Sequence, residues 1–121
     1  MEKLTHQEEE AMLVIWQHGP GVIKDFLERY SEPKPPYTTL ASIVKNLQRK
    51  GYLESKLYGN TYLYNHLISE EEYKSKYISG IVDSYFNNSY RKMVTFFAQK
   101  QKISAEELKE ITNLIESKNN L

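Results

Sequence analysis

Residues 37–66 read YTTLASIVKNLQRKGYLESKLYGNTYLYNH, and the spacing of apolar residues changes halfway along this stretch. In the first half they recur three and four positions apart, which predicts a helix over residues 37–50 with one buried face. In the second half, residues 52–58 and 61–66 are rich in aromatic and β-branched side chains and flank a Gly59-Asn60 pair, which is typical of a two-residue hairpin turn. The stretch therefore predicts a helix followed by a β-hairpin. The residues of the buried helix face are Leu40, Ile43, Val44 and Leu47.

Two further helices are predicted upstream of this stretch. The first covers residues 5–18, because Thr5 and Glu8 match a capping box and Gly19-Pro20-Gly21 ends the pattern. The second covers residues 22–30, and a loop with three prolines follows it. Three helices and a hairpin form the order of a winged helix-turn-helix, so residues 1–67 are predicted to be one such domain. The side chains available to pack the hairpin on the helices are Leu53, Leu57 and Leu63.

The remaining residues, 68–121, are predicted to form a helical arm. Helices are expected from Ser69 to Phe86, over residues 90–101 and over residues 104–118, and each carries large apolar side chains. The stripe could form a bundle within one chain or pair with a second copy, and the dimer is favoured because so short an arm makes a poor core alone. The fold class is thus mainly α with a small β-hairpin. The predicted dimerisation residues are Tyr73, Tyr77, Ile78, Ile81, Val82, Tyr85 and Phe86.

Positive charge is concentrated in the segment that contains the predicted third helix and hairpin. The whole chain has no net charge, but residues 37–66 carry four basic side chains and one acidic one, a net charge of +3. A basic window in a neutral chain indicates a local anionic partner, and the outer face of the 37–50 helix offers hydroxyls, amides and cations that suit a DNA groove. The alternative is a polar face that only meets water. The predicted DNA-binding residues are Tyr37, Thr38, Thr39, Ser42, Lys45, Asn46, Arg49, Lys50, Lys56 and Asn60.

Other classes of function receive little support from the sequence. The chain has no cysteine, so disulfides and thiol chemistry are excluded. His6 and Glu10 have the spacing of two metal ligands on one helix, but no third ligand is evident, and no metal or other cofactor is predicted. No catalytic pair or phosphate loop is found, so we expect no enzyme. Without a signal peptide or a long apolar run, we expect a cytoplasmic protein that does not insert into membranes.

The chain resembles the penicillinase repressor family over residues 4–117. The resemblance rests on the order and spacing of Leu4-Thr5-His6-Gln7-Glu8 through Ile15-Trp16, the segment from Thr38 to Leu47, Lys50-Gly51-Tyr52-Leu53, and Tyr62-Leu63-Tyr64. It implies a repressor that occupies double-stranded operator DNA as a homodimer, with Thr38, Thr39 and Ser42 facing the groove. Many members have Arg in place of Asn46 and Asn60, so this chain lacks two phosphate-neutralising charges. The competing hypothesis is a winged helix used only for protein interaction.

The resemblance also implies how repression ends. In the family, a membrane-bound metalloprotease sensor leads to cleavage of the arm before a Phe. The matching peptide bond in this chain is Phe96–Phe97, although members often have Asn where Phe96 stands. The alternative is that both phenylalanines are only core residues.

Overall fold

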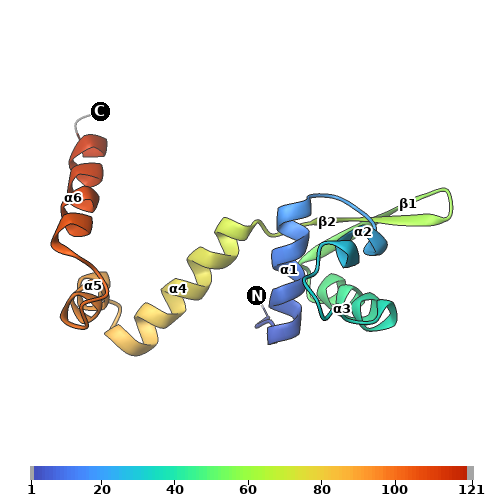
Figure 1. The fold of residues 1–121 in the computed structure, drawn as a ribbon, viewed down its shortest axis with the longest axis horizontal. Coiled ribbons are helices and arrows are strands. Elements are labelled where there is room, and N and C mark those ends of the chain that lie inside the picture. Colours follow the sequence, from blue (N-terminus) through green and yellow to red (C-terminus); the bar gives the residue numbers. More distant parts are fainter. Residues whose placement is uncertain (1, 120–121) are drawn as a thin grey trace. The chain divides into compact units, whose positions relative to one another are not determined.

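The computed structural model describes residues 2–119, which separate into two units, one ending at Lys74 and the other beginning at Ser75. The predicted helices and hairpin are confirmed, with ends within two residues of the expected ones. Figure 1 shows their order along the chain. The elements are α1 (His6–His18), α2 (Ile23–Glu28), α3 (Tyr37–Arg49), β1 (Leu53–Tyr58), β2 (Thr61–His66), α4 (Glu70–Phe86), α5 (Tyr90–Gln99) and α6 (Ala105–Asn119).

The core of the first unit lies between its three helices. The Thr5 side chain accepts from the Glu8 amide and the Glu8 carboxylate accepts from the Thr5 amide, so α1 begins with the predicted capping box. Gly51, with φ of 86°, follows the end of α3, where a left-handed residue terminates the helix. The buried apolar side chains of the three helices include Ala11, Met12, Ile15, Phe26, Leu40, Val44 and Leu47.

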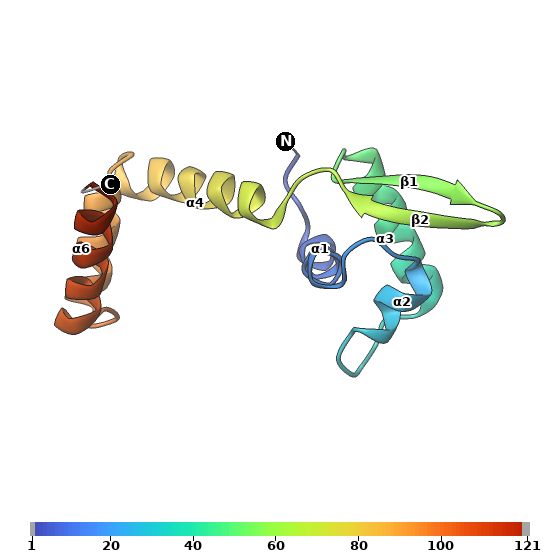
Figure 2. The same cartoon turned by 90° about the horizontal axis from the view of Figure 1, so that it is seen from above.

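The hairpin of β1, β2 and their turn, residues 53–66, is called the wing below. Its antiparallel register pairs Leu53 with His66 and Tyr58 with Thr61, so the turn falls at residues 59–60 as predicted. Leu53 is buried, but Leu57 is 58% exposed, so the expectation that Leu57 packs the wing on the helices is wrong. Leu57 lies nearer the turn, which Figures 1 and 2 show at the end that projects past the helices.

The first turn of α4 belongs to the first unit. Trp16 Nε1 donates to the Ile68 carbonyl at 2.9 Å, and the Tyr73 hydroxyl donates to the Glu9 carboxylate at 2.6 Å. The Tyr73 ring also lies 5.6 Å from that of Trp16. The structure therefore places the division after Lys74 rather than after residue 67, and Tyr73, which we predicted at a dimer interface, packs within its own chain.

The second unit holds the rest of α4 with α5 and α6. Val82 is 0% exposed within the chain, so it offers no surface to a second copy, contrary to its predicted interface role. The Phe86 and Phe96 rings pack edge to face at 5.6 Å between α4 and α5. Many apolar side chains of this unit are nevertheless exposed, and Phe96 is among them. They are Tyr77, Ile78, Tyr85, Tyr90, Val94, Phe96, Phe97, Ile111, Leu114 and Ile115. Within residues 2–119, no helix has the length and apolarity needed to span a bilayer.

Candidate nucleic-acid interface

The outer face of α3 is polar and open to solvent. Leu40, Val44 and Leu47 turn into the core, which leaves the intervening positions outside. Of the predicted DNA-binding residues on this helix, Thr39 is half-buried near the helix start and five others are exposed. The exposed ones are Tyr37, Thr38, Ser42, Lys45 and Arg49. The face therefore presents hydroxyls near its start and cations toward its end.

Asn46 is half-buried and connects two charged groups. Its amide nitrogen donates to the Glu8 carboxylate, and its amide oxygen accepts from Arg49 Nε at 3.1 Å and Nη2 at 2.9 Å. A second acid, Glu2, lies 3.9 Å from Arg49 Nη1. Because both ends of the Asn46 amide are occupied, this residue holds the Arg49 guanidinium rather than presenting a free amide to a base edge.

Lys50 departs most from the sequence prediction. Its ammonium lies 2.6 Å from the Glu8 carboxylate and 3.0 Å from the Lys3 carbonyl, and its side chain is only 8% exposed. The predicted phosphate contact by Lys50 is therefore wrong, because this cation is already neutralised inside the protein. The partner lies 42 positions upstream, so no local pattern signals the pair.

Glu8 is the buried acid around which these contacts gather. The Glu8 side chain is 3% exposed, and burial alone would oppose ionisation of its carboxyl group. Hydrogen bonds from Lys50, the Thr5 amide and Asn46 outweigh this effect and lower the pKa of Glu8 below its usual value near 4.5. The carboxylate is thus charged at neutral pH and fixes the start of α1 against the end of α3.

A groove of about 610 Å³ runs beside this cluster, between the start of α1 and the outer face of α3. Ser42, Lys45 and Arg49 line one side, and Thr5 and Gln7 line the other. Sequence reasoning did not select Gln7. Its exposed amide lies on α1, and only the tertiary packing brings it beside α3.

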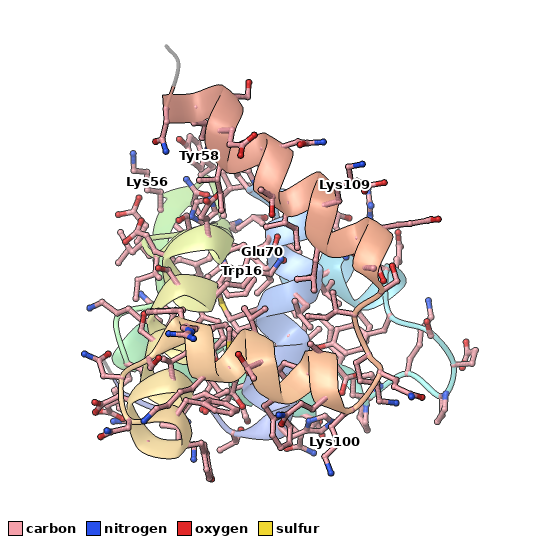
Figure 3. The ribbon with its side chains drawn as sticks, turned by 90° about the vertical axis from the view of Figure 1, so that its left-hand side faces the viewer. Trp16, Lys56, Tyr58, Glu70, Lys100 and Lys109 are labelled. Carbon is pink, nitrogen blue, oxygen red and sulfur yellow. The ribbon has the colours of Figure 1, made fainter. Side chains whose placement is uncertain are left out.

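The wing carries the remaining predicted residues. Lys56 and Asn60 are both exposed, and Lys56 extends outward from the hairpin in Figure 3, where Tyr58 is also labelled. The apolar side chains near the turn are exposed as well, Leu57, Tyr58 and Tyr62 among them. Within residues 2–119 Lys56 forms no ion pair, whereas Lys50 is paired with Glu8.

A second groove, of about 430 Å³, separates the wing from the helices. It is lined by β2 residues, by Lys24 on α2 and by Tyr37 at the start of α3. Lys24, Tyr62 and Tyr64 were not predicted as site residues, because their proximity depends on how β2 returns to the helices. No cluster of three histidine or acidic side chains suited to a metal ion occurs in residues 2–119.

Comparison with known proteins shows a match to one family. The family model described as Penicillinase repressor matches residues 4–117. The penicillinase repressor of Bacillus licheniformis is 25% identical, with 98% of this chain and 93% of that protein covered. The methicillin resistance regulatory protein MecI of Mammaliicoccus sciuri is 22% identical, with 96% and 95% covered.

Solved structures are similar at lower identity. An organohalide-sensing transcriptional regulator in its ligand-free form is 15% identical with a TM-score of 0.49, and the chain spans 64% of that protein. ZitR of Lactococcus lactis is 16% identical with a TM-score of 0.43, covering 98% of this chain and 75% of that one.

Proposed function

Since the chain belongs to the penicillinase repressor family, we propose that it represses transcription in the cytoplasm by binding operator DNA as a homodimer. The observation that carries the proposal is the exposed outer face of α3, which combines hydroxyls with Lys45 and Arg49 beside a wing that presents Lys56. Such a helix fits the major groove, and the wing cation suits the phosphate backbone. The proposal includes no catalytic step.

The proposed contacts divide along α3. Thr38, Thr39 and Ser42 lie near the helix start, where a recognition helix reaches base edges, so we assign sequence readout to them. Lys45 and Arg49 lie later on α3 and are assigned to phosphates, together with Lys56 and Asn60 of the wing. Asn46 acts through Arg49, which it holds.

The proposed dimer uses the second unit. Tyr77, Ile78 and Tyr85 of α4 are exposed, and Ile81 and Phe86 are half-buried, so a second copy can still cover all five. Exposed apolar area of this extent is unusual for a monomer. Ile78→Asp should give a monomer with weaker operator binding, whereas Lys76→Glu, which places an acid on the opposite face of α4, should stay dimeric. Analytical ultracentrifugation of both variants tests this, and a monomeric wild-type protein at micromolar concentration would contradict it.

We propose that a membrane-bound metalloprotease sensor relieves repression, and that this requires local unfolding of α5. The Phe96–Phe97 bond lies inside α5, where the Phe96 and Phe97 carbonyls accept from the Lys100 and Lys102 amides. Proteases bind their substrates in an extended conformation, so α5 must unfold locally before this bond can be cut. Mass spectrometry of the protein from cells treated with cell-wall antibiotics tests this. Derepression with an intact chain would refute cleavage.

DNA binding itself can be tested against the alternative of a protein-interaction module. Duplexes selected by the protein from random DNA should bind in fluorescence anisotropy. If the protein neutralises about six phosphates, raising the salt concentration from 50 to 200 mM should lower its affinity for DNA roughly a thousandfold. Lys45→Ala should lower the affinity for every duplex, while Lys109→Ala, an exposed lysine of α6, should not. No binding by the wild-type protein at low salt would exclude the repressor function.

A further inference from the structure

The groove between the wing and the helices gathers tyrosines from two elements. Tyr62 and Tyr64 come from β2, Tyr37 begins α3, and Lys24 adds a cation from α2. None of the lining residues is acidic, so the groove has the charge expected of an anion site.

Tyr64 is the buried member of this set. Its side chain is 6% exposed, and its backbone exchanges two hydrogen bonds with Gly21, at 3.0 and 2.8 Å, which fix this part of β2 against the start of α2. No group in residues 2–119 hydrogen-bonds to the Tyr64 hydroxyl. Among the described residues the one buried side-chain atom without a partner is His66 Nδ1, so the Tyr64 oxygen itself remains accessible from the groove and can donate to a bound group.

The Tyr64 hydroxyl acts as a donor at neutral pH. Burial raises the pKa of Tyr64, and Tyr37 and Tyr62, which line the same groove, raise it further. Each protonated phenol donates one hydrogen bond, and a phosphate oxygen accepts several. Lys24 is exposed and can neutralise the phosphate charge.

We propose that this groove binds one backbone phosphate of the operator in each protomer, with Lys24 neutralising the charge and the hydroxyls of Tyr37, Tyr62 and Tyr64 donating to its oxygens. The proposal rests on the proposed function, because α3 and the wing flank the groove and are the elements assigned to DNA. It gives Tyr37, which was predicted only as a DNA-binding residue, a contact with the DNA backbone. It also adds three residues, Lys24, Tyr62 and Tyr64, to the interface.

The test compares Lys24→Met, Tyr62→Phe and Tyr64→Phe in the full-length protein. Lys24→Met should weaken all duplexes about equally and reduce the slope of log affinity against log salt by about one. Each Tyr→Phe change should lower affinity severalfold without changing that slope, because it removes a hydrogen bond and no charge. Tyr30→Phe, a buried tyrosine outside the groove, is the matched control and should bind as the wild type does. Tyr62 is exposed, so its variant folds whatever the effect at Tyr64.

Ethylation interference identifies the phosphate directly. Wild-type protein should show one sensitive phosphate per half-site that becomes insensitive in the Lys24→Met/Tyr62→Phe variant. Wild-type affinity in all three single variants, with an unchanged ethylation pattern, would overturn this inference and leave the proposed function standing. Micromolar binding of inorganic phosphate without DNA would overturn the assignment to the DNA backbone. Failure of the wild-type protein to bind any duplex would overturn both proposals.

Discussion

Lys50→Met should destabilise the first unit because it leaves the Glu8 carboxylate buried without its cation. The two charged groups are 2.6 Å apart, and their side chains are 8% and 3% exposed. Removing one partner of a buried pair costs about 3–5 kcal/mol in the free energy of unfolding. Glu8 keeps its hydrogen bonds from Thr5 and Asn46, so we expect a loss near the lower limit. For a unit of this size, about 3 kcal/mol corresponds to roughly 12–24 °C in Tm.

A second substitution separates the charge effect from lost packing. Glu8→Gln alone removes half of the pair and should destabilise the protein. In the Lys50→Met background the same change removes an unpaired buried charge, so it should restore about 1 kcal/mol or more. The sign of the Glu8→Gln effect should therefore reverse between the two backgrounds.

Urea unfolding followed by Trp16 fluorescence measures these effects in the full-length protein. Trp16 is the only tryptophan of the chain, and it lies in the first unit, where its indole contacts Ile68. Lys45→Met changes an exposed lysine of α3. It is the matched control and should stay within about 0.5 kcal/mol of the wild type. An equal destabilising effect of Glu8→Gln in both backgrounds would refute the reasoning, as would a Lys50→Met variant as stable as the control.

Further predictions concern pH and backbone geometry. Because the pKa of Glu8 is lowered in the folded protein, its contribution to stability is present above about pH 4.5 and is lost as the pH falls through the lowered value. Urea midpoints between pH 3 and 7 should show this loss, and Glu8→Gln should flatten the dependence. Gly21→Ala should destabilise by about 1–3 kcal/mol, because the added Cβ would lie 2.7 Å from the His18 ring and 3.1 Å from Phe26. A thermal melt unchanged from the wild type would contradict that clash. Gly51→Ala should lower the free energy of unfolding by about 1 kcal/mol, because φ at this position is 86°. A variant that melts at or above the wild-type temperature would contradict this.

Local patterns were sufficient to predict the secondary structure but not the longer contacts. The spacing of Leu40, Val44 and Leu47 predicts the buried face of α3, because helical periodicity depends only on neighbouring residues. The Gly59-Asn60 turn predicts the wing in the same way. Leu57 shows the limit of this approach, since alternation in a strand does not reveal how far the strand continues past the core.

The exposure of the proposed interface residues was predicted where it follows from the helix pattern and was missed where it depends on tertiary packing. Thr38, Ser42 and Lys45 are exposed because their neighbours are buried. The pairing of Lys50 with Glu8 joins segments 42 positions apart, and no spacing rule relates them. The packing of Tyr73 on Trp16 and the burial of Val82 have the same cause. An apolar stripe identifies residues that need cover, but it does not identify which part of the chain provides it.

The contacts of Glu8 restrict how this protein can evolve. One carboxylate caps α1 through Thr5, pairs with Lys50 and, through Asn46, orients Arg49. A substitution at any one of these positions leaves a buried charge or amide without its partner. Single replacements are therefore selected against, even though none of these residues is assigned to readout of the DNA sequence. The cluster is therefore expected to change as a linked set among descendants. Thr38 and Ser42, for which no side-chain hydrogen bond is found within residues 2–119, can change singly, as their proposed role in operator readout requires.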